Sequence, residues 1–183
     1  MRVIAGVARS LPLKCPKGLD TRPTTDRIKE TLFNMLQPYT QGSVFVDMFS
    51  GSGAIGIEAL SRGAKKAYFI DNGANALSCI QENLLFTKLA DKAVVLKQDA
   101  VSALGSIFEK EADIIFMDAP YGLDLEKQVL SAMREYRYVT EDTLIIVEAE
   151  AGTDFSYAEA LGYQVVKEKI YKSNKHVFLK IAG

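Results

Sequence analysis

The sequence contains two cysteines, one histidine and no long apolar run. Cys15 and Cys79 lie far apart without a CxxC pattern, so we expect two free thiols in a reducing compartment and no metal site. No apolar stretch approaches the ~20 residues needed to cross a bilayer. Arg9 interrupts the first apolar residues before they reach the length of a secretory signal. These absences exclude disulfide-stapled and membrane-spanning proteins and predict a cytoplasmic one.

The scarcity of histidine also limits the chemistry. No Ser/His/Asp or Cys/His set can be assembled with confidence around His176, the only histidine. We interpret His176 as a packing or surface residue of a terminal hairpin. Glu148 and Glu150 end a predicted strand, and we assign them no role because acids are common at strand ends.

Charge is unevenly distributed along the 183 residues, although the net charge is only −1. Residues 1–30 carry a net charge of +4, which leaves −5 for the rest. A basic arm on a mildly acidic body favours a local contact with a polyanion, and the alternative is a solvated surface hairpin. The length and the 48% hydrophobic content are typical of one globular domain, which we assign to residues 1–183. Nothing in the sequence demands a dimer, so we expect a monomer.

Five short apolar runs alternate with segments of helical periodicity. The runs are continuous, which indicates strands covered on both faces of a parallel sheet. Leu77, Ile80 and Leu84 recur at helical spacing in one of the intervening segments. This alternation predicts a doubly wound α/β fold. The predicted strands are 44–46, 67–70, 93–96, 113–117 and 144–147, and the crossover helices are 53–62, 74–89, 100–110 and 124–137.

The end of the chain departs from that alternation. Residues 163–172 and 175–181 are strand-like and are separated only by Ser173-Asn174, so they predict an antiparallel hairpin. A mostly parallel seven-stranded sheet that ends in such a hairpin, with helices on both faces, is typical of the Rossmann-like class I methyltransferase fold. It is less typical of nicotinamide-binding domains.

The start of the chain predicts an extension and a helix. Residues 2–14 favour a small β-hairpin with Gly6 near its turn, within a basic extension 1–20 that precedes a catalytic core 21–183. Thr24 or Thr25 is the predicted N-cap of the helix that follows.

A glycine-rich segment follows the first predicted strand. Gly51, Gly53 and Gly56 satisfy GxGxxG, a weak signal alone, but in the right place between a strand and a helix. Glycines there let the backbone turn sharply and approach a ligand closely. Asp47, four residues earlier, would repel a pyrophosphate but could accept hydrogen bonds from the ammonium of a methionine moiety. Because S-adenosylmethionine has a positive sulfonium and no phosphate, this charge favours it over a dinucleotide.

Two further acids close the next two predicted strands. Asp71 can take both hydroxyls of an adenosine ribose, and Asp99 could accept from the adenine N6 amine. Either acid alone could be a solvated strand end or an N-cap, but with Asp47 and Asp118 all four fall at carboxyl ends of strands. The predicted cofactor site comprises Asp47, Phe49, Gly51, Gly53, Asp71, Asn72, Asp99, Ala100 and Thr25.

The segment Asp118-Ala119-Pro120-Tyr121 follows the fourth predicted strand and is the candidate catalytic site. The lone pair of an exocyclic amine on a nucleobase is delocalised, so the amine is a poor nucleophile. Hydrogen bonds from its N–H groups to the Asp118 carboxylate and the Ala119 carbonyl would orient the lone pair and stabilise developing charge. Pro120 would stiffen the turn, and Tyr121 offers a face for stacking. The alternative is an ordinary exit from a strand into a turn.

With these residues the sequence resembles the bacterial 16S rRNA guanine-N2 methyltransferases of the RsmD type, over nearly the whole chain. The glycine segment is shared by many methyltransferases, whereas Arg-Pro-Thr-Thr-Asp-Arg at 22–27 is much more particular to this family. The segments that match are 2–6, 22–27, 30–34, 47–56 and 58–64.

The resemblance implies methylation of a guanine N2 amine in 16S rRNA, which can be naked or partly assembled into a small ribosomal subunit. It implies that the helix opened by Thr24-Thr25 directs its positive end toward the carboxylate of the cofactor. The target base would be unstacked beside Tyr121. The residues expected to meet RNA phosphates are Arg2, Arg9, Lys14 and Arg22.

Two residues depart from the family pattern. Ala119 stands where relatives usually have proline; its carbonyl survives, so we expect activity with a less rigid loop. Asp71 stands where glutamate is common, which shifts the predicted ribose contact by a methylene. Neither change removes a group that the mechanism needs.

Other functions fit parts of the same pattern. Methylation of adenine N6 in nucleic acid or of a protein glutamine amide uses similar residues but would need a recognition domain or substrate arm. A nicotinamide oxidoreductase is disfavoured by Asp47 and the terminal hairpin. A catalytically silent RNA-binding module is disfavoured by the presence of Asp118, Pro120 and Tyr121.

Overall fold

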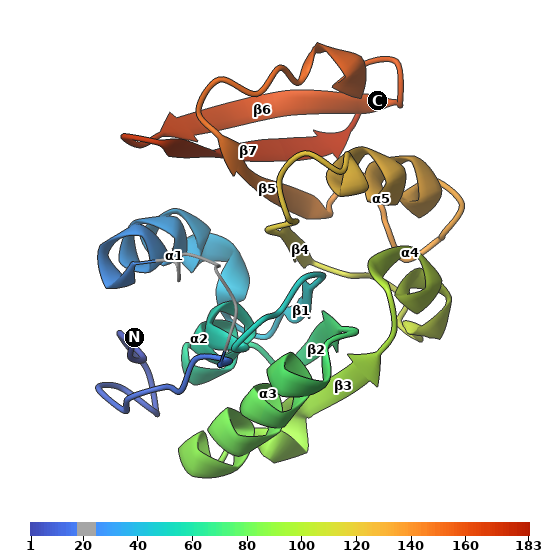
Figure 1. The fold of residues 1–183 in the computed structure, drawn as a ribbon. Coiled ribbons are helices and arrows are strands. Elements are labelled where there is room, and N and C mark those ends of the chain that lie inside the picture. Colours follow the sequence, from blue (N-terminus) through green and yellow to red (C-terminus); the bar gives the residue numbers. More distant parts are fainter. Residues whose placement is uncertain (18–24) are drawn as a thin grey trace.

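The computed structural model describes residues 1–17 and 25–183, which form a seven-stranded sheet with helices on both faces (Figure 1). The strands are β1 (Val44–Asp47), β2 (Lys66–Asp71), β3 (Ala93–Lys97), β4 (Ile114–Met117), β5 (Leu144–Glu150), β6 (Tyr163–Ile170) and β7 (Asn174–Ile181). The helices are α1 (Asp26–Thr40), α2 (Ala54–Ser61), α3 (Ala74–Thr87), α4 (Ala100–Ala103) and α5 (Leu125–Met133), with 3-10 turns η1 (Ala90–Lys92), η2 (Leu104–Ser106) and η3 (Ser156–Ala158).

The strand order is β3-β2-β1-β4-β5-β7-β6, in which β1 to β5 are parallel and β7 is antiparallel to both β5 and β6. The first strand, β1, lies at the centre of the sheet, and β2 and β3 follow outward on one side. The chain then crosses to the other side of β1 for β4 and β5, and the antiparallel hairpin of β6 and β7 completes that side. The predicted fold class is therefore confirmed, including the hairpin that ends the sheet.

Two apolar layers hold the helices to the sheet. Val46, Ile115 and Val147 lie in the layer beneath α4 and α5, whereas Phe45 and Phe116 lie in the layer beneath α1, α2 and α3. The strands β1 and β4 are buried throughout, which explains why their sequences are continuous apolar runs. Burial of one such side chain contributes about 1.5–3 kcal/mol, so these layers dominate the packing.

Three elements differ by three or more residues from their predicted lengths; one is the helix predicted at 124–137, where α5 spans only Leu125–Met133, and the other two have identifiable causes. The helix predicted at 100–110 is one turn, α4, followed by the 3-10 turn η2 at Leu104–Ser106, which contains Gly105. The strand predicted at 144–147 extends to Glu150, because β7 pairs with it as far as Asn174. The apolar pattern gives no sign of either change, because the shortening of α4 depends on a turn and the lengthening of β5 depends on a distant strand.

The predicted hairpin at 2–14 is present as a closed loop with one antiparallel bridge, between Arg2 and Pro12, and without regular strands. Val3 donates to the Leu11 carbonyl and Ser10 donates to the Val3 carbonyl, which closes the loop. Gly6 adopts a φ of 88°, and a Cβ there would lie 1.9 Å from the Ser61 carbonyl oxygen. The loop therefore needs glycine to pack against α2.

The start of α1 matches one of the two predicted caps. The Thr25 hydroxyl accepts a hydrogen bond from the Ile28 N–H at 3.2 Å, so Thr25 is the N-cap. The alternative cap, Thr24, and the predicted RNA contact Arg22 lie outside the described residues. Within residues 1–17 and 25–183, no helix is long and apolar enough to cross a membrane.

Candidate active site

Acidic residues meet where the parallel strands end. Asp47, the last residue of β1, is in register with Phe69 of β2 and Phe116 of β4. Asp71 and Asp118 each lie two residues beyond those partners and therefore stand on either side of Asp47. Both carboxylates are close enough to affect the titration of Asp47. The predicted clustering of these acids is present in the structure, and their roles remain predictions.

The loop between β1 and α2 is held in a fixed shape by Ser50. The Ser50 hydroxyl donates to the Asp47 carbonyl at 2.9 Å and accepts from the Ile70 N–H at 3.1 Å, which ties the loop to β2. Gly51 and Gly53 have φ values of 57° and 81°, in the left-handed region that glycine tolerates. A Cβ on Gly51 would meet nothing within 4 Å, so this stretch of backbone is open to a ligand. Sequence reasoning missed Ser50, which lies directly before the GxGxxG motif.

Asp47 has one carboxylate oxygen with a partner and one without. It is only 1% exposed, and Oδ2 accepts from the Gly56 N–H at 3.3 Å. Oδ1 is buried and has no hydrogen-bond partner among the described residues. Burial raises the pKa of Asp47 to about 7, and the charges of Asp118 and Asp71 add to the rise. A buried acceptor without a donor is costly, so this atom suits a ligand that brings one.

Asp71 and Asp99 both hold backbone N–H groups. Asp71 accepts from Gly51 at 3.0 Å and from Gly73 at 2.9 Å, and it thereby joins the glycine loop to the start of α3. Asp99 is exposed and is the N-cap of α4, with the Ser102 N–H at 3.0 Å. Hydrogen bonds from Ser102 lower the pKa of Asp99. Asp99 thus has the structural role weighed as its alternative, whereas Asp71 is not a helix cap and instead links two loops. Each acid retains acceptor capacity for a ligand.

The other predicted cofactor residues flank these acids. Phe49 is half-buried in the glycine loop, Asn72 is exposed after β2, and Ala100 is buried at the start of α4. Thr25 lies at the start of α1, where its hydroxyl is engaged as the helix cap. Their contacts with a cofactor remain predictions.

The segment 118–121 leads from the buried end of β4 to the surface. Asp118 is half-buried and Ala119 is 6% exposed, whereas Pro120 and Tyr121 are exposed, Tyr121 by 55%. Burial raises the pKa of Asp118 well above its usual range, and the nearby charge of Glu148 adds to the rise. A carboxyl thus lies at the base of the segment and an aromatic ring at its rim, and their roles toward a planar substrate remain predictions.

A buried polar chain behind Asp118 was not predicted. Glu148 is 7% exposed and His176 is fully buried, with His176 Nε2 only 2.6 Å from Glu148 Oε1. The Tyr171 hydroxyl lies 3.1 Å from His176 Nδ1. The interpretation of His176 as a packing residue is incomplete, because its ring links two polar side chains. The available signal was the position of Glu148, which ends the predicted strand that pairs with the strand before Asp118.

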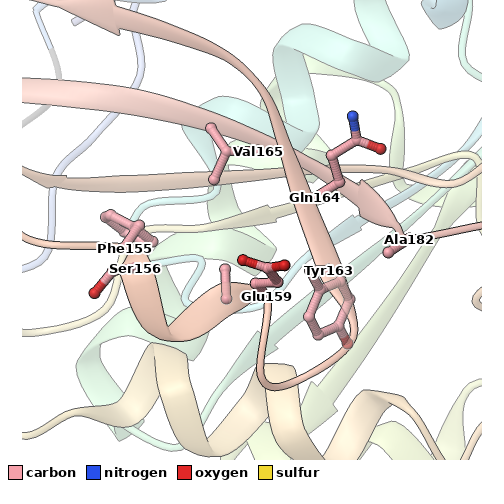
Figure 2. A pocket seen from close by; sticks show the side chains of 8 residues that line it. Phe155, Ser156, Glu159, Tyr163, Gln164, Val165 and Ala182 are labelled. Carbon is pink, nitrogen blue, oxygen red and sulfur yellow. The ribbon is translucent and has the colours of Figure 1, made fainter.

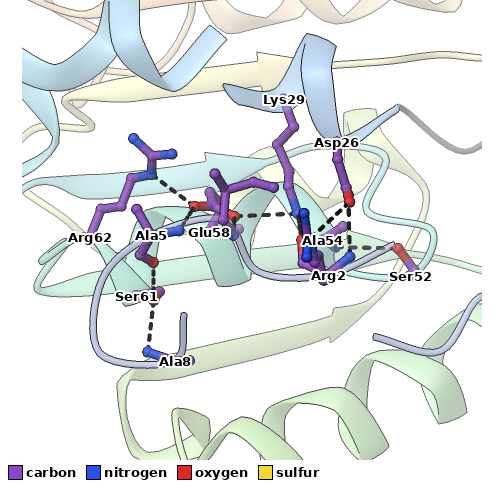
Figure 3. Close-up of polar contacts among 12 residues, drawn as sticks. Arg2, Ala5, Ala8, Asp26, Lys29, Ser52, Ala54, Glu58, Ser61 and Arg62 are labelled. Atoms are coloured by element: carbon purple, nitrogen blue, oxygen red, sulfur yellow. Dashed lines mark hydrogen bonds and ion pairs between the residues drawn. The ribbon is translucent and has the colours of Figure 1, made fainter. Parts of the chain in front are cut away.

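The amino-terminal segment is anchored by Glu58 of α2 (Figure 3). Glu58 accepts from the N–H groups of Ile4 at 2.9 Å and Ala5 at 3.1 Å. It also pairs with Lys29 at 3.3 Å and Arg62 at 2.8 Å, and the side chains of Glu58 and Lys29 are fully buried. The segment is therefore held firmly against α1 and α2.

The predicted RNA contacts on this segment are exposed. Arg2 pairs with Asp26 at 3.4 Å, and Lys14 pairs with Glu82 at 2.9 Å, but both basic side chains remain largely accessible. Arg9 is exposed on the same segment. The amide of Asn83 donates to the carbonyls of Lys14 and Ser52, both at 2.9 Å. The segment therefore runs beside the glycine loop.

A hollow of about 410 Å³ lies elsewhere, between the 155–159 segment and the start of β6 (Figure 2). None of the predicted site residues lines it, and its wall includes apolar side chains such as Phe155 and Val165. Within residues 1–17 and 25–183, no group of three or more His, Cys, Asp or Glu side chains could hold a metal ion. The candidate chemistry therefore centres on the acids at the end of β1, β2 and β4.

Comparisons with known proteins match the chain over nearly its full length. It is 36% identical over 173 residues to ribosomal RNA small subunit methyltransferase D of Haemophilus influenzae, covering 92% of this chain and 88% of that one. It is 35% identical over 150 residues to the Escherichia coli K12 protein of the same name, covering 82% and 75%. The solved structure of Escherichia coli yhhF has a TM-score of 0.82 at 31% identity, covering 100% of this chain and 98% of that one.

The family described as Conserved hypothetical protein 95 matches residues 1–180. This range includes the glycine loop, the acids at the strand ends and the segment 118–121. The family resemblance stated from the sequence is therefore confirmed, and the chain belongs to this family, which includes the small-subunit rRNA methyltransferases named above.

Proposed function

We propose that this protein transfers a methyl group from S-adenosylmethionine to the exocyclic N2 amine of a guanine in 16S rRNA. The observation that carries the proposal is the meeting of Asp47, Asp71 and Asp118 at one end of the sheet, beside an open glycine loop. The relatives named as small-subunit rRNA methyltransferases support the substrate class. We infer that the protein acts as a monomer in the cytoplasm, on 16S rRNA that is naked or part of a small subunit.

The site fits S-adenosylmethionine by its charges. When bound, this cofactor supplies an electrophilic methyl group on a positive sulfonium. The unpartnered Oδ1 of Asp47 is suited to accept from an ammonium, a donor that a pyrophosphate lacks. Asp71 and Asp99 are suited to the ribose hydroxyls and the adenine amine. Phe49, Asn72 and Ala100 would complete the site.

Asp118 would act on the substrate amine. Its carboxylate accepts a hydrogen bond from the amine and orients the nitrogen lone pair toward the methyl group. The Ala119 carbonyl, one residue later, would be the second acceptor, and this backbone oxygen does not depend on the proline that relatives usually carry. Tyr121 at the exposed rim offers a stacking surface for an unstacked base.

The amino-terminal segment would position the RNA. Arg2, Arg9 and Lys14 are exposed on a backbone that Glu58 fixes to the body of the protein. Contacts from such side chains to phosphates set position and register without reading the sequence. Arg22 would extend the same set. Because Asn83 ties Lys14 to the glycine loop, RNA bound there would lie near the acids.

Methyl-transfer assays on several substrates test the proposal. Purified protein and S-adenosylmethionine with a labelled methyl group are offered unmodified 16S rRNA, small subunits that lack the modification, duplex DNA and a protein extract. Label recovered as N2-methylguanosine is the expected result, and a preference for subunits would indicate recognition of an assembled surface. Label only in DNA or protein would refute the rRNA assignment, and absence of label despite cofactor binding would favour a silent RNA-binding module.

A further inference from the structure

The strand register explains why Asp118 touches a buried chain of polar side chains. Met117 is in register with Val147, so Asp118 and Glu148 are neighbours on adjacent parallel strands. Glu148 pairs directly with His176 across β5 and β7. In-register neighbours project to the same face of a sheet, so these three side chains meet. Tyr171, just beyond the end of β6, reaches the far nitrogen of the ring.

The hydrogen bonds of this chain run in one direction. Burial lowers the pKa of His176 to about 4, so near pH 7 the ring is neutral and carries one N–H. Since Nε2 lies 2.6 Å from a Glu148 oxygen, that nitrogen carries the proton and Nδ1 accepts. Burial raises the pKa of Tyr171 to about 12, which keeps its hydroxyl a donor. Tyr171 thus donates to His176, and His176 donates to Glu148.

The Asp118 and Glu148 carboxyls form a coupled acid pair. They lie within hydrogen-bonding reach, and burial raises the pKa of both. Two carboxyls this close, one buried and one half-buried, do not both ionise near pH 7, so the pair holds one proton between them. Asp118 also raises the pKa of Asp47 on β1, while His176 and Tyr171 face the pair from β7 and from the end of β6.

Resting on the function proposed above, we propose that Glu148 and His176 are positioning residues for methyl transfer and act through Asp118. His176 occupies one oxygen of Glu148 and directs the other toward Asp118. The shared proton engages one Asp118 oxygen and leaves the second to accept from the substrate amine. After the nitrogen gains a methyl group, one N–H bond breaks with its electron pair left on nitrogen. Its proton passes to that second oxygen, so the pair then holds two protons.

Nitrogen NMR of the only histidine tests the chain of hydrogen bonds from Tyr171 to Asp118 without any substrate. In full-length protein labelled with nitrogen-15 histidine, we expect a neutral Nε2–H tautomer at pH 7. The His176 signals should also show two steps: the acid pair takes up a second proton at the lower one and loses its shared proton at the upper one. Glu148→Gln and Asp118→Asn each leave a single acid, so each variant should show one step. Glu150→Gln, which changes an exposed acid two residues further along β5, should leave both steps in place.

Activity measurements test whether this chain of hydrogen bonds affects the reaction. Wild-type kcat should fall at low pH with a midpoint that matches the lower NMR step, and it should fall again at the upper step, where the shared proton that holds Asp118 is lost. Glu148→Gln keeps a donor toward Asp118 and an acceptor for His176 but cannot ionise, so its kcat should not fall at the upper step. Glu148→Ala breaks the chain and should lower kcat about tenfold or more at every pH, with little change in the KM for S-adenosylmethionine.

The outcomes separate this inference from the proposed function. An imidazolium or an Nδ1–H tautomer at pH 7, or two NMR steps in Glu148→Gln, overturns the hydrogen-bond chain. A fall in kcat at the upper step that persists in Glu148→Gln overturns its link to catalysis. Equal kcat in Glu148→Ala and wild type does the same. If wild-type protein methylates no RNA, the proposed function fails, while the NMR result still decides whether the chain exists.

Discussion

Two buried glutamates in this protein have opposite surroundings. Glu58, fully buried in α2, accepts from two backbone N–H groups and pairs with Lys29 and Arg62. Glu148, 7% exposed within β5, accepts from the neutral ring of His176 and has the carboxyl of Asp118 as its neighbour. The two glutamates are similarly buried, but Glu58 is surrounded by hydrogen-bond donors and cations, whereas Glu148 has few donors around it.

This difference in surroundings makes Glu58 a structural acid and Glu148 an acid that can change its protonation state. A carboxylate surrounded by cations and N–H groups is stabilised in its charged form, and its removal strands those donors in the core. A carboxyl facing another carboxyl keeps a proton that the surroundings can move. Glu58 therefore fixes the segment that carries the predicted RNA contacts, whereas Glu148 lies where protons can be exchanged with a substrate.

Removal of Glu58 should have the largest effect on stability. Glu58→Ala leaves Lys29, which is fully buried, without its carboxylate partner, although the Arg2 carbonyl still accepts from it, and burial already lowers the pKa of Lys29. Loss of one member of a buried ion pair costs about 3–5 kcal/mol. Denaturant unfolding measures the change, and Glu82→Ala, which breaks only the exposed pair with Lys14, is the matched control. Equal unfolding curves for both variants would show that Glu58 is not an anchor.

Removal of Asp118 should have the largest effect on activity. Asp118→Ala takes away the group that orients the substrate amine, and losses of this kind lower kcat by about a hundredfold to a thousandfold. Cofactor affinity, measured by calorimetry, should change little. Stability should not fall, because burial disfavours the ionised Asp118. A variant with full methyl transfer would refute the catalytic assignment.

Asp47 should lower the stability of the folded protein at neutral pH, because its carboxylate is buried and one of its oxygens has no partner. Its folded pKa of about 7 exceeds the usual 3.8, so the folded state holds a proton that the unfolded chain loses as the pH rises between these values. The stabilising effect of that proton is full below 3.8 and is lost by about pH 7, a change of up to about 4 kcal/mol.

Asp47→Asn should therefore unfold at a higher temperature than wild type above pH 7 and show a weaker pH dependence between about 4 and 7. The gain should be about 1–3 kcal/mol, since the new amide N–H lacks an acceptor. The same N–H would face a cofactor ammonium, so affinity for S-adenosylmethionine should drop. Thermal unfolding from pH 4 to 8 checks the first effect and calorimetry the second. A variant that is less stable than wild type at pH 8 would contradict this account.

The sequence predicted the features that depend on local pattern. Continuous apolar runs predicted the strands, and Ser173-Asn174 predicted the terminal hairpin, whose turn lies at Tyr171–Ser173 in the structure. The acids at strand ends could be grouped because parallel strands share one carboxyl edge. In the structure Asp47 is in register with Phe69 and Phe116, which places Asp71 and Asp118 on either side of it.

Features that depend on long-range pairing could not be predicted in the same way. Glu148 and His176 meet only because β7 turns back against β5, a register that no local pattern encodes. The anchoring of Ile4 and Ala5 on Glu58 joins segments more than 50 positions apart. Sequence patterns predicted a basic hairpin but not that its backbone N–H groups would be held by a buried carboxylate.

The smallest expected effect concerns the segment that Glu58 anchors. Arg9 has no ion pair among the described residues, whereas Lys14 pairs with Glu82. If both side chains contact phosphate, Arg9→Ala should reduce the slope of log K against log salt for RNA binding by about one, and Lys14→Ala by less, because Glu82 already offsets its charge. Binding assays at several salt concentrations measure the slopes. Unchanged slopes in both variants would place the RNA contact elsewhere and leave Glu58 as an anchor of the fold alone.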